Sequence, residues 1–509
     1  MAQDDDLVPG HKVELGAEFV HGSTTRINAL AEEFGWELQE VFTWAQGDGG
    51  PSEQPAEGGG WGAYWLGRDK KLLAYDAKDK DFNHLNEVLW EIANIPASES
   101  ERDTRSIKTY LEDAGVSPRM LALADAGYAN TCGGPMHDIS LRFQCANERV
   151  WESDDGDGDY RIVGSFSQLI DALVDPNSHD PFPYRNPAKR VVGLKEEPLR
   201  VRTCSPVAEV YWTPPNCKVA GAPCVIPSGV PHASDLTCEG ASPVRVVTCG
   251  GEILGCEVCV FTAPLPLLRD GVVQFYPPLP PSKRQAAARI GVGQAAKLLL
   301  VFSERVWPAK LDGVVCADTP IPEFWFRELK GAGPPSSDGR GEKSSLWLAT
   351  GYCMGNFAQA ARQRGQAACL EVACAQLDEM FCTSRGQDHE RVAATGGVGG
   401  EDIPPASQHF VKGVLHDWAA EPYARVGYTH GRTGTDASSD FAAMGTPLGG
   451  GRVQFAGEAY LSVGANMTVH AALEQGHYVA SQVAATLRAK PDGDSASGNA
   501  AAPVTRSRL

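Results

Sequence analysis

The 509-residue sequence has no run of 18 or more apolar residues, which is the length a helix needs to cross a bilayer. Its N-terminus, MAQDDDLVPGHKV, has acidic residues where a secretory signal carries positive charge followed by an apolar run. The sequence therefore predicts a protein without a membrane span that is not exported. At this length and with 42% hydrophobic residues, it predicts one or two large cores.

Basic residues are also few, with 45 Lys and Arg against 64 Asp and Glu and a formal charge of −19. This balance disfavours a general affinity for nucleic acid, because binding phosphates requires a basic surface. An acidic surface can attract polycationic substrates, and solubility alone explains it equally well.

Cysteine is absent after Cys382, and half of the 14 cysteines lie between Cys204 and Cys259. Without export we expect reduced thiols rather than a disulfide framework. Cys256 and Cys259 have CxxC spacing, but no second CxxC or His pair accompanies them. The sequence therefore predicts no metal site.

The sequence also lacks a dinucleotide-binding glycine motif between a predicted strand and a predicted helix. Residues 58–63 and 291–296 match GxGxxA, but the first lies in a Pro- and Gly-rich stretch and the second leads into an apolar strand. The fingerprint works between a strand and a helix, where the glycines let the backbone approach a pyrophosphate. Neither match is predicted to bind one.

The stretch most informative about function is residues 453–487, VQFAGEAYLSVGANMTVHAALEQGHYVASQVAATL. It predicts a short buried strand, a Gly-containing loop and a helix with apolar residues at Val469, Ala472, Leu473, Gly476, Ala480, Val483 and Leu487. Unpaired N–H groups at the start of such a helix attract an anion or a carbonyl-rich ring. On this pattern alone an ordinary strand-to-helix crossover is the more common explanation.

Other segments predict further elements. Apolar spacing predicts helices over 83–94, 104–114 and 359–380, and apolar runs predict strands at 324–326 and 346–349. Residues 204–243 are rich in Pro, Gly, Ser and Cys without periodicity, which predicts a loop insertion. Residues 491–509 have the composition of a flexible tail.

Three motifs carry a resemblance to a known family. FAGE followed about ten residues later by TVH resembles the C-terminal flavin signature of the FAD-dependent amine oxidases. ELGAEFVHG at 14–22 resembles their ELGAxWxHG segment, and 275–302 resembles their FxPPLPxxKxxAIxxLGxGxxxKVxLxF segment. The family includes polyamine oxidases, monoamine oxidases and lysine-specific histone demethylases, and the resemblance covers Glu14 to Leu487 apart from the insertion.

The resemblance implies an α/β fold of two domains. One is a Rossmann-like FAD-binding domain that here lacks its N-terminal βαβ unit, and the other is a substrate domain with a mixed sheet and helices. The expected FAD-binding domain is discontinuous and comprises 1–30, 150–275 and 440–490. The expected substrate domain comprises 31–149 and 276–439.

The resemblance also implies catalytic residues. In the family, the lysine at the position of Lys297 holds a water at the flavin N5, although a lysine at a strand edge is commonly solvated. His21 stands where several polyamine oxidases place an ionisable residue facing the amine, although a lone His after a strand is commonly structural. Tyr428 falls on one wall of an aromatic cage. Thr468 stands on the opposite wall, where monoamine oxidases and some polyamine oxidases have Tyr and histone demethylases and other polyamine oxidases have Thr.

FAD is the implied cofactor, and it would be non-covalent because no cysteine lies near Tyr428, where monoamine oxidases attach their flavin. The expected cofactor-binding residues are Glu14, Gly16, Ala17, Val191, Pro264, Trp418, Tyr423, Gly457, Glu458, Thr468 and Val469. Family members transfer a hydride from the carbon beside the amine nitrogen to the flavin, hydrolyse the imine, and regenerate the flavin with dioxygen.

The expected activity is oxidation of polyamines, such as spermine, spermidine or their acetylated forms, to an aldehyde, a shorter amine and hydrogen peroxide. Monoamines and methylated lysine are the alternative substrates. A third alternative is an inactive or truncated paralogue that does not hold FAD, because only thirteen residues precede Glu14 where relatives have about fifty with a strand, GxGxxG and a helix. We accordingly expect an upstream segment in the natural product, and weak FAD binding and aggregation without it.

The final residues, Ser507-Arg508-Leu509, are a conservative variant of the Ser-Lys-Leu peroxisomal address. They predict a peroxisomal location with the import receptor as a partner, and a chance tripeptide on a cytoplasmic protein is the alternative. A peroxide-producing enzyme suits a catalase-rich compartment.

Overall fold

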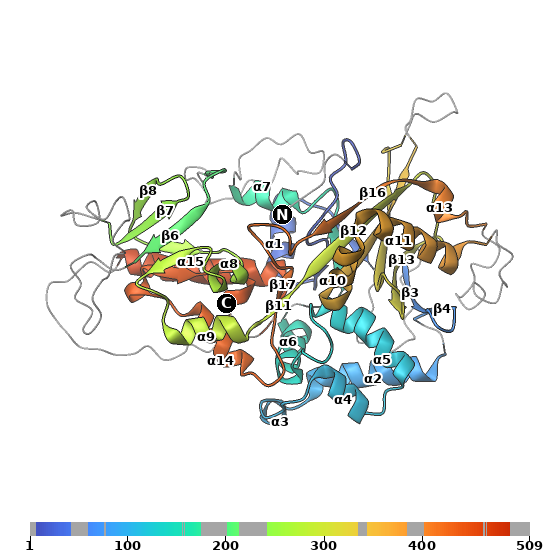
Figure 1. The fold of residues 1–509 in the computed structure, drawn as a ribbon, viewed down its shortest axis with the longest axis horizontal. Coiled ribbons are helices and arrows are strands. Elements are labelled where there is room, and N and C mark those ends of the chain that lie inside the picture. The colour runs from blue at the N-terminus through green and yellow to red at the C-terminus, as the bar shows by residue number, and fades with distance from the viewer. Residues whose placement is uncertain are drawn as a thin grey trace.

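The computed structural model describes residues 7–41, 60–75, 78–154, 156, 158–174, 201–212, 242–333, 344–383, 402–461, 464 and 466–488. These residues form an α/β structure with two lobes (Figure 1). One lobe is built on a seven-stranded sheet, and the other on two smaller sheets with helices against them. Val191 and the last three residues lie outside the described part of the chain.

The large sheet is mixed, and only the β13–β3 pair is parallel. In spatial order its strands are β16 (Phe410–Asp417), β12 (Ala295–Phe302), β15 (Leu346–Met354), β14 (Glu323–Leu329), β13 (Leu311–Ala317), β3 (Trp61–Leu66) and β4 (Lys71–Ala74). β12 is buried along its whole length because it is flanked by strands on both sides and covered on both faces. The strands predicted at 324–326 and 346–349 are confirmed.

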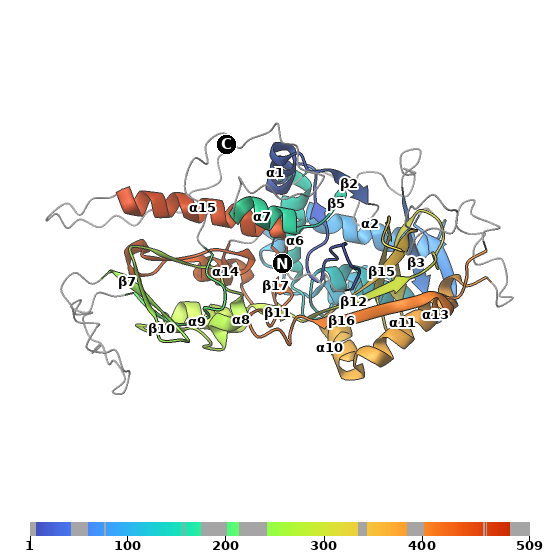
Figure 2. The same ribbon diagram turned by 90° about the horizontal axis from the view of Figure 1, so that it is seen from above.

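Helices cover both faces of this sheet (Figures 1 and 2). One face packs on α10 (Gly355–Arg364), α11 (Gln366–Phe381) and α13 (Ala406–His409). The other packs at one end on α2 (Lys80–Asn94), α4 (Ile107–Asp113), α5 (Pro118–Ala124) and the π-helix η1 (Asp125–Ala129). α6 (Leu141–Asp154) lies alongside α2, and α3 (Ala97–Ser100) contacts α6. At its other end, near β12, residues 7–15 complete the cover.

The helices predicted over 83–94 and 104–114 are confirmed, with bounds shifted by a few residues. The helical stretch predicted over 359–380 is confirmed, but Gly365 interrupts it and divides it into α10 and α11. Gly365 has φ +80°, a left-handed conformation that a helix interior does not contain. Apolar periodicity continued across the break and concealed it.

The second lobe contains a four-stranded sheet of β10 (Gln274–Tyr276), β6 (Val207–Tyr211), β7 (Val244–Thr248) and β8 (Ile253–Cys256). β6 lies inside the predicted loop insertion 204–243, so the start of that insertion is corrected. Val207, Val210 and Tyr211 supply apolar side chains to the lobe, which the Pro- and Cys-rich surroundings obscured. Residues 213–241 lie outside the described chain.

A parallel pair, β18 (Val453–Phe455) and β9 (Cys259–Phe261), lies beside this sheet, which confirms the strand predicted in the C-terminal motif. Helices α8 (Leu265–Arg269), α9 (Pro281–Arg289), α14 (Ala437–Gly445) and α15 (Val469–Arg488) and the short turns η3 (Gly449–Gly451) and η4 (Glu458–Tyr460) complete the lobe. Figure 2 shows α15 and α7 (Ser167–Val174) above α9 and β10. The predicted C-terminal helix is confirmed, although Leu487 is exposed.

Short strands lie where the lobes meet. β1 (Val20–His21), β5 (Asp159–Ile162) and β2 (Leu38–Val41) form a three-stranded antiparallel sheet next to α1 (Arg26–Phe34). β11 (Gly291–Gly293) pairs with β17 (Tyr428–His430), and β11 runs on into β12. The GxGxxA match at 291–296 therefore joins two strands, as expected of a sequence that does not bind a pyrophosphate.

No helix of the described chain combines the length and apolar character needed to cross a bilayer. Within the same residues, no group of three or more His, Cys, Asp or Glu side chains is placed to hold a metal ion. The cysteines of the described segments are free thiols.

Candidate active site

Lys297 is the most constrained of the predicted catalytic residues. It lies in β12 with its side chain buried on the face opposite α10 and α11. Its Nζ donates to the Oε2 of Glu18 at 2.9 Å, to the carbonyl of Gly16 at 2.9 Å and to the carbonyl of Glu14 at 3.2 Å. The alternative of a solvated strand-edge lysine is wrong, because Lys297 is only 5% exposed.

Glu18 is the buried counter-ion of Lys297, and the sequence analysis did not assign it. Its Oε1 accepts a hydrogen bond from the Nε of Arg161 at 3.1 Å. Burial favours a higher pKa for Glu18, but the charges of Lys297, Arg161 and Arg327 outweigh it and hold the pKa well below its usual range. The signal was a carboxylate between apolar residues in the stretch ELGAEFVHG.

The side chain of Glu14 connects residues 14–18 to the residue before α7 and to β14. Its Oε1 accepts from the backbone N–H of Phe166, just before α7, at 3.0 Å, and its Oε2 lies 3.4 Å from the guanidinium of Arg327 in β14. Glu14 is buried, so its backbone and side chain together hold the segment against Lys297.

Trp418 braces the opposite side of this segment. Its indole N–H donates to the carbonyl of Leu15 at 2.7 Å, and its ring lies so close to Gly16 that a Cβ there would be 3.2 Å from it. Residues 14–18 thus lie between Lys297 and Trp418, and a Cβ at Gly16 would require the indole to shift slightly. Glu14, Gly16, Lys297 and Trp418, which were predicted separately, are brought together here.

A second group of side chains surrounds Tyr428. Its hydroxyl lies 2.6 Å from the hydroxyl of Tyr352, and it also donates to the carbonyl of Thr131. Tyr352 stands directly opposite Lys297 in the β12–β15 pairing. Burial raises the pKa of Tyr428 well above its usual value, so both phenols remain protonated at neutral pH.

Glu323, at the start of β14, is a buried carboxyl that the sequence analysis missed. It is 4% exposed, and its Oε2 accepts from the amide of Asn130 at 3.0 Å. Burial raises its pKa to about 7, and the nearby charges of His21 and Lys297 oppose that rise. Asn130 also donates to the carbonyl of Tyr352, which links Glu323 to the tyrosine pair. An acidic residue directly before the apolar run FWF was the available signal.

Glu458 connects this region to the C-terminal motif. Its Oε2 accepts from the hydroxyl of Thr429 at 2.8 Å and from the N–H of Thr429 at 3.3 Å. Burial raises the pKa of Glu458 to about 7. Gly457 before it has φ +127°, a conformation that side chains rarely adopt, so the turn from β18 into η4 requires glycine.

Thr468 and Val469 begin α15, as the motif predicted. The Oγ1 of Thr468 accepts from the N–H of Ala471 at 3.2 Å, which satisfies one of the open donors of the first turn. Val469 packs against the apolar cluster of α1 and α7. The start of α15 is thereby fixed close to η4, which α15 contacts.

The remaining predicted residues differ in their burial and in their contacts. The Nδ1 of His21 lies 2.6 Å from Asp159 across the β1–β5 pair, and its side chain is 46% exposed. Tyr423 is 64% exposed. Pro264 precedes α8 and accepts from the N–H of Leu267 through its carbonyl. Ala17 is partly buried within the segment held by Lys297.

The comparison with protein families is decisive. Residues 2–484 match the model described as "Flavin containing amine oxidoreductase". The chain belongs to the flavin-containing amine oxidoreductases. The resemblance inferred from the motifs is thus confirmed.

Structural neighbours agree with this membership in fold. An A394C mutant of putrescine oxidase superposes with a TM-score of 0.62 at 15% identity, covering 95% of this chain and 90% of that one. Cyclohexylamine oxidase from Brevibacterium oxydans IH-35A superposes with a TM-score of 0.59 at 15% identity, covering 96% and 90%. The predicted α/β fold of a flavin amine oxidase is confirmed.

Sequence relatives match shorter stretches. Human lysine-specific histone demethylase 2 is 26% identical over 228 residues, which are 42% of this chain and 23% of that protein. Polyamine oxidase 2 of Arabidopsis thaliana is 35% identical over 94 residues, 18% of this chain and 19% of that protein. The chain therefore spans about a quarter or less of the length of these relatives.

As a flavin-containing amine oxidoreductase the protein uses FAD, and its residues fit the flavin end of that cofactor. A Cβ at Gly16 would crowd Trp418, and a Cβ at Gly457 would strain the backbone. Glycine at such positions is expected where the backbone closely approaches the flavin ring. Glu14, Trp418, Glu458 and the start of α15 would hold the cofactor around them. No strand–GxGxxG–helix unit occurs within the described segments, so these residues account for the flavin end alone.

Proposed function

We propose that this amine oxidoreductase oxidises polyamines, such as spermine, spermidine or their acetylated forms, to an aldehyde and a shorter amine. The observation that carries this proposal is Glu323, a buried carboxyl beside the Tyr352–Tyr428 pair. A second ammonium group is what distinguishes a polyamine from a monoamine, and a buried carboxylate is the group that recognises it.

The titration of Glu323 suits this role. With a pKa of about 7 the carboxyl is partly protonated at neutral pH, and a nearby ammonium ion would favour its ionised form. A ligand with a cation at this position would therefore bind together with the release of a proton. A purely apolar amine would leave the buried group without that partner.

The other residues act through position. Lys297, held by Glu18 and two carbonyls, fixes the 14–18 segment and places a cation at the sheet face. The two tyrosines supply rings and neutral hydroxyls beside it. When bound, FAD supplies the hydride acceptor and passes the electrons to dioxygen, giving hydrogen peroxide. The protein's task is to orient the amine and to exclude water.

The charge and the relatives support the same proposal. A net charge of −19 attracts polycations over long range. One sequence relative is a polyamine oxidase and one structural neighbour is a putrescine oxidase. The human relative is a histone demethylase, so methylated lysine is the second candidate substrate.

The test is steady-state oxidation by the FAD-loaded protein of spermine, spermidine, benzylamine and a dimethyl-lysine peptide, with peroxide release as the readout. We expect the highest kcat/KM for spermine or spermidine. Glu323→Gln should lower that value by about tenfold or more, the worth of one charged hydrogen bond, and leave benzylamine within about twofold. Glu328→Gln on the exposed part of the same strand is the matched control.

Faster turnover of benzylamine or of the peptide would overturn the polyamine proposal. An equal loss for spermidine and benzylamine in Glu323→Gln would assign Glu323 a structural role in packing around Asn130 instead. Absence of a flavin absorption band after incubation with FAD would indicate a non-catalytic protein.

We also propose that the enzyme acts in peroxisomes, on the basis of Ser507-Arg508-Leu509. A fluorescent protein fused to the N-terminus leaves this tripeptide free for the import receptor. We expect punctate signal that coincides with a peroxisomal marker and is lost when Leu509 is deleted. Diffuse cytoplasmic signal from the intact fusion would overturn the proposal.

A further inference from the structure

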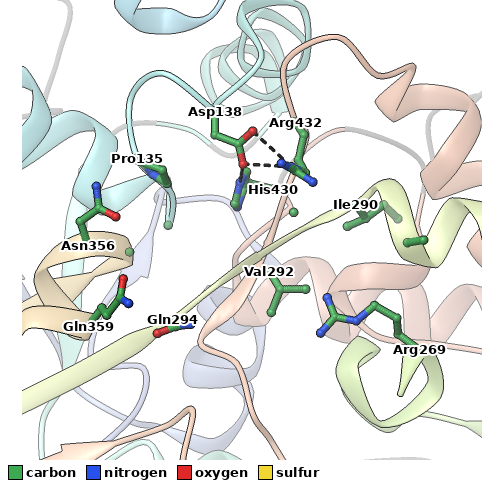
Figure 3. Close-up of a pocket in the computed structure, with 14 residues that line it drawn as sticks. Pro135, Asp138, Arg269, Ile290, Val292, Gln294, Asn356, Gln359, His430 and Arg432 are labelled. Atoms are coloured by element: carbon green, nitrogen blue, oxygen red, sulfur yellow. Dashed lines mark hydrogen bonds and ion pairs between the residues drawn. The ribbon is translucent and has the colours of Figure 1, made fainter. Parts of the chain in front are cut away.

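A polar pocket of about 280 Å³ lies beside the β11–β17 pair, where the two lobes meet (Figure 3). It is bordered by α8 and α9 of one lobe, by the start of α10 in the other, and by β11 and β17 between them. None of the predicted catalytic or cofactor-binding residues that the structure describes lines it. The expected reaction therefore leaves this pocket without a role.

His430 is the central side chain of the pocket. It is 2% exposed, and its Nε2 lies 3.5 Å from the Oδ2 of Asp138. Its Nδ1 has no hydrogen-bond partner among the described residues. The backbones of Gly134 and Gly291 press on the ring, since a Cβ at these positions would lie 2.8 and 2.3 Å from it. The imidazole is thus held in place with a buried polar atom that lacks a partner, which is costly unless something binds there.

Two arginines present unused donors to the same pocket. Arg432 contacts Asp138 through its Nε, at 3.0 and 3.2 Å. Arg269 contacts its neighbour Asp270 through its Nε at 2.9 Å. Within the described chain, no hydrogen bond is made by the terminal nitrogens of either guanidinium, and these nitrogens carry the paired donors that recognise oxyanions.

The first turn of α10 adds a third source of positive potential. Gly355, Asn356 and Gln359 line the pocket, and this turn contains no acidic residue and no side-chain cap. The amino end of a ten-residue helix attracts anions through its dipole and through the N–H groups of its first turn, of which that of Gly355 already donates to the carbonyl of Gln294. The side-chain amides of Asn356 and Gln359 lie on the same side (Figure 3) and can donate as well.

We propose that this pocket binds a small oxyanion, a phosphate or a carboxylate, between His430, the two arginines and the start of α10. Among the described residues, Asp138 is the single acidic residue that lines it, and it already forms an ion pair with Arg432 at 3.0 Å. A bound oxyanion would contact elements of both lobes. It would also act on β17, the strand that carries Tyr428 two residues before His430.

The test is isothermal titration of the purified full-length chain, at constant ionic strength, with inorganic phosphate and separately with succinate. We expect saturable binding of one equivalent of the better probe. Arg269→Gln should weaken it by about tenfold or more, as the loss of one charge-assisted hydrogen bond predicts. Arg269 is the preferred site because its one ion pair within the described chain is with the adjacent Asp270 on the surface, so its replacement should not disturb folding.

Arg68→Gln, which removes a surface arginine paired with Asp318 outside the pocket lining, is the matched control and should bind the probe as the natural protein does. His430→Gln is the second variant, and it should also weaken binding while keeping an unchanged circular dichroism spectrum. Saturable binding of phosphate but not succinate identifies a phosphate site, and the reverse identifies a carboxylate site. Absence of saturable binding by both, or equal binding by Arg269→Gln and the natural protein, would overturn the proposal.

Discussion

Replacing Lys297 by Met removes the cation from a buried ion pair while keeping most of the side-chain volume. Glu18 would retain only Arg161 as a close partner, and the carbonyls of Glu14 and Gly16 would lose their donor. Breaking a buried pair by removing one partner costs about 3–5 kcal/mol, because the remaining charge stays buried. The lost carbonyl partners act within the same network and do not add independently. We therefore expect a loss of about 3–5 kcal/mol in the free energy of unfolding.

Urea-induced unfolding followed by tryptophan fluorescence at pH 7 measures this loss. Lys283→Met is the matched control, since Lys283 is also buried and donates to two carbonyls, of Ala443 and Met444, but no carboxylate ion pair is formed by it in the described chain. We expect a smaller loss in this control. The Lys297→Met/Glu18→Gln double variant should be more stable than Lys297→Met alone by at least about 1 kcal/mol, because the orphaned charge is gone.

The pH dependence gives a further check. The pKa of Glu18 is lowered in the folded protein, so its stabilisation is present above its unfolded pKa of about 4.5 and is lost as the pH falls below it. The difference between the natural protein and Lys297→Met should therefore narrow under acid. A loss below about 1 kcal/mol at pH 7, or a double variant no more stable than Lys297→Met, would refute the assignment of Glu18 as its buried counter-ion.

Three further predictions concern other buried groups. Burial lowers the pKa of Lys283 to about 7. As the pH rises from 7 towards 10, the free energy of unfolding of the natural protein should therefore increase relative to that of Lys283→Met, by up to about 1.4 kcal/mol per pH unit. A difference between the two proteins that does not change with pH in urea unfolding would contradict this. The pKa of Glu458 is raised to about 7, so its ionisation lowers the free energy of unfolding as the pH rises from 4.5 through 7. Glu458→Gln keeps an acceptor for Thr429 and should be more stable than the natural protein at pH 8 in the same assay. Tyr352→Phe removes the hydroxyl bonded to Tyr428 and should lower kcat/KM for the preferred amine about fivefold, which corresponds to one neutral hydrogen bond of about 1 kcal/mol. An unchanged kcat/KM would show that the hydrogen bond between the two tyrosines does not position the ring of Tyr428.

The sequence by itself determined the family and the local elements of its motifs. The strand and helix of the C-terminal motif lie where apolar periodicity placed them, because a buried strand and an amphipathic helix leave patterns within one continuous stretch. Gly457 could likewise be assigned to a tight turn from its place between them. Positions such as Lys297 and Glu14 were found because they sit inside motifs.

The partners of those residues were decided only by the tertiary structure. Glu18 and Lys297 are 279 residues apart, and Asn130 and Glu323 are 193 apart, so no local pattern pairs them. The pKa and the role of a lone charged residue beside an apolar strand, such as Glu323, depend on whether its side chain is buried. That burial depends on how the sheet and the helices pack. The break at Gly365 and the strand within 204–243 were missed because periodicity reports the burial of a face and does not report where the backbone turns. The folded arrangement of the two lobes decides which charged residues lie together in a buried site and what their pKa values are.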